Sequence, residues 1–330
     1  MVLNLGIIGC GRVTTMFHLK AINSLDHIVV KAVADVDSNR RESVKRKARA
    51  EHAYEDYREL LSDPEVDFVA VNTPPQYHEE MSFDSLMYDK HVLCEKPLSQ
   101  TVTGCERLKA KMEETGLHLL PVHNYAFTPS LLKMKDLYND DIIGELERVE
   151  IVFSNNLSGY RSHTDFRLLK FDGIVEDVLP HVLSVANPFT GASVDVNGIS
   201  WRCEKYDVCD NLKVNFDTEK GIELDCTLSW TGFLPRFIVK VKGDYGEMGT
   251  DLMLGPYSVR LRNEDGVKKF QDRGLGWLFD LIAFKHPSFP NQYRHLIELI
   301  EGKTCNPKIS IDDEISILKA MAQVSERITG

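Results

Sequence analysis

The first 124 residues alternate between short apolar runs and longer amphipathic segments. The apolar runs are rich in β-branched residues and almost continuous, which is typical of strands buried on both faces of a parallel sheet. They cover residues 4–9, 27–35, 66–74, 90–96 and 117–124. The segments between them have helical spacing, and several begin at Asp or Ser or end at Gly. Regular alternation of strand and helix predicts an α/β fold with a doubly wound parallel sheet.

The pattern changes after residue 124, where polar and apolar residues alternate one by one. This period is typical of strands with one exposed face. It recurs in residues 143–155, 196–207, 211–219, 221–230, 236–243, 247–254 and 257–263, with helical spacing at 172–189, 291–302 and 312–328. We therefore predict a first domain at residues 1–124 and an α+β domain at 125–330, built on a large, open, mostly antiparallel sheet. It stays open whether the C-terminal helix packs back on the first domain.

An open sheet of this kind is expected to leave one apolar face without enough helices to cover it. Exposed apolar patches of that size mark interfaces. We therefore expect a homodimer or homotetramer that assembles through the second sheet.

Composition narrows the classes of protein to consider. A chain of 330 residues with 43% hydrophobic content is long enough for two cores. With 39 basic against 50 acidic residues and a net charge of −11, nucleic acid is not an expected partner. The seven cysteines are scattered and form no C-x-x-C pair, so we expect no structural metal and a reducing, cytoplasmic location. No apolar stretch approaches the roughly 20 residues of a membrane span, and the first strand begins without a charged, leader-like segment before it, so we expect neither a membrane span nor an export leader.

Gly9-Cys10-Gly11 directly follows the first predicted strand. One interpretation is a tight turn in which glycine supplies a positive φ. The other is a loop that lets a pyrophosphate approach backbone N–H groups at a helix N-terminus. The full G-x-G-x-x-G/A pattern is broken by Thr14. The strand before and the helix after nevertheless favour the dinucleotide site.

Asp35 ends the second predicted strand, 24 positions after Gly11. An acid at about that distance accepts hydrogen bonds from the adenosine ribose of NAD and repels the 2′-phosphate of NADP. We therefore expect NAD rather than NADP. The alternative role, capping the next helix, suits Asp37 better. Arg40 and Arg41 keep NADP open, because either could meet a phosphate.

Several motifs together resemble one family. They are "GIIGCGRV" at 6–13, "AVADVD" at 32–37, "NTPPQYH" at 72–78, "CEKPLS" at 94–99, "HNYAFTP" at 123–129, the spaced Asp177 and His181, and "SFPNQYRHLIELI" at 288–300. The chain resembles the Gfo/Idh/MocA dehydrogenases over essentially its whole length. The resemblance implies a Rossmann domain followed by an open-sheet domain. It also implies NAD or NADP as cofactor, and hydride transfer with sugars, polyols and related alcohols or ketones.

Hydride transfer at a carbinol carbon needs a group that exchanges the hydroxyl proton and a group that stabilises the developing oxyanion. Lys96 ends a strand at the carboxyl edge of the predicted sheet, where ligands of such sheets bind. Asp177 and His181 are four residues apart on a predicted helix and therefore share one face. A surface pair or two metal ligands would have the same spacing, but no third ligand is evident.

The resemblance assigns roles to these three residues. His181 would be the general acid/base, Asp177 would orient it or bind a substrate hydroxyl, and Lys96 would act on the reacting oxygen or on His181. Pro180, unusual inside a helix, predicts a kink beside His181.

Other residues carry over from the family motifs. The cofactor set is Gly9, Gly11, Arg12, Val13, Asp35, Arg40, Asn72, Thr73, Pro74, His78, Glu95 and Lys96. The substrate set is Asn124, Tyr125, Arg167, Asp177 and His181. His78 has the alternative role of an ordinary helix-face histidine, and Arg167 that of a surface arginine. Ala126 stands where many members of the family have arginine.

The predicted function is an NAD-dependent oxidoreductase acting on a small, carbohydrate-like substrate. Two alternatives stay open, a dinucleotide-binding metabolite sensor without turnover and a redox-neutral glycosidase or lyase that uses NAD transiently. Retention of Lys96, Asp177 and His181 together favours the enzyme, because a sensor needs only binding.

Overall fold

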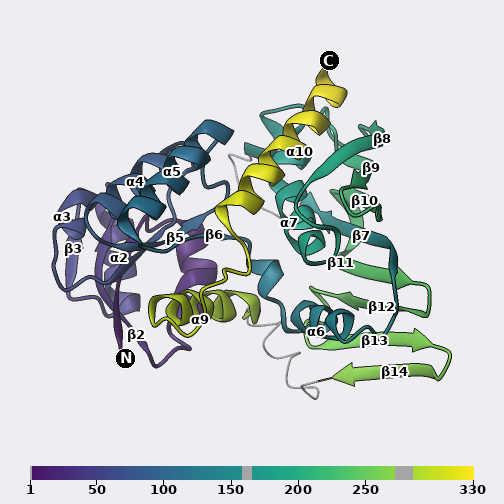
Figure 1. The fold of residues 1–330 in the computed structure, drawn as a ribbon. Coiled ribbons are helices and arrows are strands. Elements are labelled where there is room, and N and C mark those ends of the chain that lie inside the picture. The colour runs from purple at the N-terminus through teal and green to yellow at the C-terminus, as the bar shows by residue number, and fades with distance from the viewer. Residues whose placement is uncertain (1, 158–165, 272–284) are drawn as a thin grey trace. The chain divides into compact units, whose positions relative to one another are not determined.

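The computed structural model describes residues 2–157, 166–271 and 285–330 (Figure 1). The chain forms two compact units. The first comprises Met1–Asn124 and Asp280–Ile315, and the second comprises Tyr125–Phe279 and Ser316–Gly330. The stretch Asp280–Ile315 thus belongs to the first unit, although the sequence pattern assigned all of 125–330 to the second domain.

The first unit is built on a six-stranded parallel sheet in the order β3-β2-β1-β4-β5-β6. Its strands are β1 Leu3–Ile8, β2 Ile28–Ala34, β3 His52–Tyr54, β4 Phe68–Val71, β5 His91–Glu95 and β6 Leu119–Val122. Its helices are a π-helix at Thr14–His18, α1 Leu19–Ile22, α2 Ser38–Ala48, α3 Tyr57–Leu61, α4 His78–Met87, α5 Val102–Thr115 and α9 Ser288–Ile300. Strand order reverses direction between β1 and β4, the point where ligands bind in doubly wound sheets.

The continuous apolar runs of the sequence explain this sheet. All four residues of β4 and of β6 are buried, as expected for strands covered on both faces. Asp37 caps α2 by accepting a hydrogen bond from the N–H of Arg40, as anticipated for an acid at that position. The predicted doubly wound sheet is confirmed. The short strand β3, with its half-exposed residues, had no apolar run to predict it.

The second unit is built on an eight-stranded sheet in the order β14-β13-β12-β11-β7-β10-β9-β8. Its strands are β7 Leu146–Asn156, β8 Val194–Arg202, β9 Asn211–Thr218, β10 Glu223–Ser229, β11 Thr231–Gly243, β12 Gly246–Asp251, β13 Ser258–Asn263 and β14 Gly266–Gln271. Its helices are α6 Pro129–Asn139, α7 Gly173–Thr190 and the larger part of α10, Ile311–Thr329. The β7–β10 pair is parallel and the other pairs are antiparallel, which confirms the mostly antiparallel sheet.

Side chains on the two faces of this sheet differ sharply. Val149, Ile151 and Val239 are buried in one core with Val178 and Val182 of α7. The other face is charged, and it holds the ion pairs Arg148–Asp225, Lys240–Glu150 and Lys242–Glu147. The uncovered face is therefore largely charged rather than apolar at the central strands, and its exposed apolar residues include Phe233 and Leu234 of β11.

None of the helices in the described ranges is long and apolar enough to cross a membrane.

Candidate functional site

The glycine loop after β1 needs its first glycine for the fold and leaves room at its second. Gly9 has a φ of +94°, and a Cβ there would lie 2.7 Å from the carbonyl oxygen of Asn72. A Cβ on Gly11 would meet nothing within 4 Å. Thr14, in place of the third glycine, is buried and donates its hydroxyl to the carbonyl of Gly9 at 2.6 Å. The loop is therefore packed against Asn72 at Gly9, whereas space beside Gly11 is free for a phosphate to approach the backbone.

Asn72 marks the other side of this cradle, at the end of β4. Its side chain is 5% exposed, and within the described residues neither its Oδ1 nor its Nδ2 has a hydrogen-bond partner. Buried polar atoms are normally satisfied, so an orphaned amide beside a glycine loop fits a bound polar group. The residues present therefore fit a dinucleotide at the β1–β4 switch point.

Asp35 follows β2 and connects it to the glycine loop. Its carboxylate accepts the N–H of Cys10 at 2.7 Å and the N–H of Asp37 at 2.8 Å. Arg40 Nη2 lies 2.9 Å from the same group, and Arg41 donates to the carbonyl of Asp35. Burial alone would raise the pKa of Asp35, but Arg40 and the two N–H donors lower it below its ordinary value. The carboxylate is thus ionised, and the positive charge of Arg40 partly compensates its negative charge.

Lys96 directly follows β5, joined to Pro97 by a cis peptide bond. Its neighbour Glu95 is held by His18 of the π-helix, whose Nε2 lies 2.9 Å from Glu95 Oε1. His18 Nδ1 in turn contacts Tyr293 Oη of α9 at 2.8 Å. The strand end that carries Lys96 is therefore fixed by a buried chain of polar groups, and π-helical turns of this kind are frequent at functional sites.

His78, which the motif placed in the cofactor set, contacts two carbonyl oxygens of the chain itself. Its Nδ1 lies 2.8 Å from the oxygen of Pro97 and its Nε2 lies 2.7 Å from that of Thr73. Burial alone would lower the pKa of His78, but Cys94 and the two carbonyls raise it to about 9. Because both nitrogens are engaged, we interpret His78 as a brace between the ends of β4 and β5.

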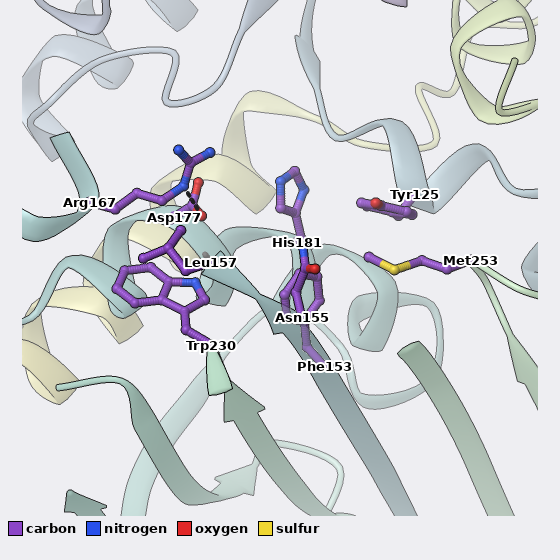
Figure 2. A pocket seen from close by; sticks show the side chains of 9 residues that line it. All are labelled: Tyr125, Phe153, Asn155, Leu157, Arg167, Asp177, His181, Trp230 and Met253. Atoms are coloured by element: carbon purple, nitrogen blue, oxygen red, sulfur yellow. Dashed lines mark hydrogen bonds and ion pairs between the residues drawn. The ribbon is translucent and has the colours of Figure 1, made fainter. Parts of the chain in front are cut away.

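The second unit contains a hollow of about 110 Å³ beside α7 (Figure 2). Alternate residues of β7 and polar residues of α7 face it. It is lined by Tyr125, Phe153, Asn155, Leu157, Arg167, Asp177, His181, Trp230 and Met253. Four substrate residues expected from the sequence thus lie in one place, namely Tyr125, Arg167, Asp177 and His181. The fifth, Asn124, belongs to the first unit, where its amide donates to Ser288 Oγ at 3.0 Å.

Arg167 and Asp177 form an ion pair at one side of the hollow, with Arg167 Nε 2.8 Å from Asp177 Oδ2 (Figure 2). Arg167 lies in a short 3₁₀ turn, Phe166–Leu168, ahead of α7. Gly173, the first residue of α7, permits this arrangement because a Cβ there would collide with the carbonyl oxygen of Arg167. The pair places a fixed cation and a fixed anion at the wall of a partly buried site.

His181 lies between that pair and Tyr125 in Figure 2. The rings of Tyr125 and His181 meet edge to face, with their centroids 5.3 Å apart. Pro180 and Pro188 lie within α7, which nevertheless runs from Gly173 to Thr190 as one helix. The side chains of Asp177 and His181 share one helix face, as their spacing predicts.

The sequence did not point to His18, His123, Tyr293 or Glu314, which support the end of β5 and the residues after it. His123 and Tyr293 lie within the motifs at 123–129 and 288–300, which is the signal that could have found them, whereas His18 and Glu314 lie in no quoted motif. Among the residues that the structure describes, no group of three or more His, Cys, Asp or Glu side chains is arranged to hold a metal ion.

Comparison with known proteins identifies the first unit. Residues 3–123 match the model of the oxidoreductase family with an NAD-binding Rossmann fold. These residues belong to the Gfo/Idh/MocA family. Over these residues the resemblance drawn from the sequence motifs is confirmed, and the glycine cradle lies in the family's NAD-binding fold.

Relatives of the family extend the comparison. The myo-inositol 2-dehydrogenase of Thermotoga maritima is 32% identical over 43% of this chain and 42% of its own length. The chain thus matches about two fifths of that relative. A 1-carboxy-3-chloro-3,4-dihydroxycyclohexa-1,5-diene dehydrogenase of Comamonas testosteroni is 24% identical over 93% of this chain and 79% of its own length.

A solved structure shows the same fold over the whole chain. It is an oxidoreductase from Agrobacterium radiobacter in complex with NAD⁺, L-tartaric acid and magnesium. It covers 100% of this chain and 97% of its own, with a TM-score of 0.86 and 19% identity.

Proposed function

We propose that this protein is an NAD-dependent oxidoreductase that transfers a hydride between nicotinamide and a sugar, polyol or related alcohol or ketone. The observation that carries the proposal is the convergence of Asp177, His181 and Arg167 on one hollow, in a chain whose other unit has the NAD-binding fold. Cofactor would be held by the Gly9–Gly11 loop, with Arg12 and Val13 after it, by Asn72, Thr73 and Pro74 after β4, and by Asp35.

The chemistry divides between the cofactor and the protein. NAD, when bound, supplies the acceptor for the hydride that leaves the carbinol carbon. His181 would take the hydroxyl proton as general base, and Lys96 would stabilise the charge that develops on the reacting oxygen or act on His181. Asp177, fixed by Arg167, orients the substrate through a neighbouring hydroxyl or orients His181. In the reverse direction His181 returns the proton.

The relatives guide the choice of substrates. The two named above act, by their names, on myo-inositol and on a carboxylated cyclic diene with two hydroxyl groups. Both are rings that carry neighbouring oxygens. The aromatic wall of Trp230 and Phe153 beside a polar edge suits a ring of this kind. We therefore propose cyclic polyols as the first substrates to test.

The test is a panel of inositols, sugars and sugar acids with NAD, followed by absorbance of the reduced nicotinamide. We expect turnover of at least one, with kcat lowered about 10² to 10⁴-fold in Lys96→Met and in His181→Ala. NAD affinity, measured by titration calorimetry, should not change. The exposed Lys47→Met and His27→Ala serve as matched controls and should keep full activity.

Two outcomes would favour the alternatives. A sensor would turn over nothing and would keep its ligand affinity in His181→Ala. A redox-neutral glycosidase or lyase would consume a glycoside or polyol without net reduction of NAD. Full activity in His181→Ala would refute the assignment of the catalytic base.

A further inference from the structure

A buried carboxylate from the C-terminal helix reaches the segment that follows Lys96. Glu314 of α10 is 1% exposed. Its Oε1 accepts a hydrogen bond from the N–H of Leu98 at 2.9 Å, two residues after Lys96. Its Oε2 lies 2.5 Å from Nε2 of His123, a fully buried residue that follows β6. Glu314 therefore ties together the ends of two neighbouring strands of the parallel sheet.

A second acid–histidine pair holds the same segment from its other end. Glu95 precedes Lys96 and pairs with His18. Burial alone would raise the pKa of Glu95 and of Glu314. The partner histidines, His18 and His123, outweigh burial, and the charge of Lys96 also lowers the pKa of both acids. Both acids are therefore ionised, and both are hydrogen-bonded within the segment that carries Lys96.

Packing alone does not require a carboxylate at position 314. Burying a charge is costly, and a neutral amide could also accept the N–H of Leu98 and contact His123. What an amide could not supply is negative charge beside Lys96. The negative charge of Glu314 is therefore not needed for these local hydrogen bonds.

We propose that Glu314 is a positioning residue for Lys96. It fixes the backbone just after Lys96 and provides negative charge that holds the Lys96 ammonium in place at the end of β5. This inference rests on the proposed function in so far as it concerns turnover. Its structural part rests on the contacts of Glu314 with Leu98 and His123 within the first unit.

The decisive variant is Glu314→Gln, which keeps the shape and the acceptor for Leu98 but removes the charge. We expect kcat to fall about 10 to 100-fold, the cost of a misplaced catalytic group, with KM and NAD affinity unchanged. The control is Asp312→Asn on the same helix, whose acid is exposed and pairs with Lys109. Unchanged kcat in Glu314→Gln would overturn the proposal.

A second measurement does not depend on turnover. Reductive methylation of lysines, followed by peptide mass spectrometry, reports how fast Lys96 reacts relative to the other lysines. We expect Lys96 to react severalfold faster in Glu314→Gln than in the wild type and in Asp312→Asn. An unchanged labelling rate would refute the inference even if no substrate is found. Altered labelling without any turnover would instead refute the proposed function and leave Glu314 as the residue that controls Lys96.

Two further variants separate charge from structure. His123→Gln keeps a donor toward Glu314 but removes the histidine that offsets its burial, so kcat and the labelling of Lys96 should change in the same direction as in Glu314→Gln, by a smaller amount. Losses equal to those of Glu314→Gln would assign the role to His123 instead. If Glu314→Gln does not fold, Glu314→Asp retains the charge but is too short to reach both partners. The proposal then requires a decrease in kcat smaller than the one expected for Glu314→Gln, and full activity in Glu314→Asp would contradict it.

Discussion

Arg40 lies against the carboxylate of Asp35, with Nη2 2.9 Å from Oδ1 and Nε 3.3 Å from both oxygens. The acid expected to exclude the 2′-phosphate of NADP is therefore paired with a cation that could attract it. Arg40 is half exposed, while Asp35 is nearly buried. We therefore expect the balance between these two charges, rather than Asp35 alone, to set the cofactor preference.

The first prediction concerns that balance. NAD should bind more tightly than NADP in the wild type, because Asp35 still presents a carboxylate to the ribose. Asp35→Ser should shift the preference toward NADP by about tenfold, the effect of one hydrogen bond to a charged group, because Arg40 is then released. Titration calorimetry with both cofactors measures it. The double variant Asp35→Ser with Arg40→Ser should lose this gain, and equal NADP affinity in the wild type would contradict the role of Asp35.

The two glycines of the loop should respond differently to alanine. Gly9→Ala should lower the free energy of unfolding by about 2 kcal/mol or more, because its positive φ and the nearby Asn72 carbonyl both oppose a Cβ. Gly11→Ala should leave the free energy of unfolding within about 1 kcal/mol of the wild type, since its Cβ meets open space. It should nevertheless weaken NAD binding. Urea unfolding and calorimetry distinguish the two, and a stable Gly9→Ala would show that the loop can relax.

Much of the first unit could be predicted because its signals are local. The apolar runs, the glycines after β1 and the acid after β2 all lie within a few residues of the structure they specify. Alternation likewise predicted most strands of the second sheet. It missed α6, which begins at Pro129, and β14, whose residues are mostly exposed and follow no apolar period.

The supporting residues of the site could not be predicted for a physical reason. Glu314 reaches Leu98 across 216 positions, and Tyr293 reaches His18 across 275. Such contacts depend on how distant segments pack, and a single acid or tyrosine has no periodicity. The pairing of Arg167 with Asp177 likewise depends on the close approach at Gly173, which no spacing rule indicates. The uncovered face was expected to be apolar and is largely charged at the central strands, because alternation alone does not reveal how well helices cover the inner face.

Stability should depend on pH through His78. Its pKa is raised from an ordinary value of 6.5 to about 9, so the folded state favours the charged ring. The stabilisation is fully present below pH 6.5 and is lost as the pH rises through 9; a shift of this size corresponds to at most about 3 kcal/mol. Urea unfolding at a series of pH values should show a decline across this window in the wild type. His78→Gln should have a lower free energy of unfolding at pH 6.5, and this free energy should change less with pH above 6.5 than that of the wild type. Parallel curves for the two proteins would refute the charged brace.

Assembly remains a prediction, and the charged sheet face changes how it is tested. We still expect a homodimer or homotetramer through the second sheet, now with Phe233 and Leu234 of β11 as its apolar contacts, since Phe233 is 93% exposed. Light scattering at micromolar concentration should give a multiple of 37.5 kDa. Replacing both residues by serine should reduce the mass toward the monomer, with the exposed Met87→Ser as control. A monomeric wild type would contradict the prediction.

The final prediction tests whether Lys96 and His181 act on the same oxygen. In the proposed mechanism Lys96 stabilises the charge that His181 creates by removing the proton, so either loss disables the same step. The effects of Lys96→Met and His181→Ala on kcat should therefore be strongly non-additive, with the double variant little worse than the poorer single variant. Single-turnover kinetics with saturating NAD isolates the chemical step, and calorimetry checks that NAD affinity is retained. If the two losses instead multiply, the residues contribute independently, and Lys96 would have to be reassigned to cofactor binding alone.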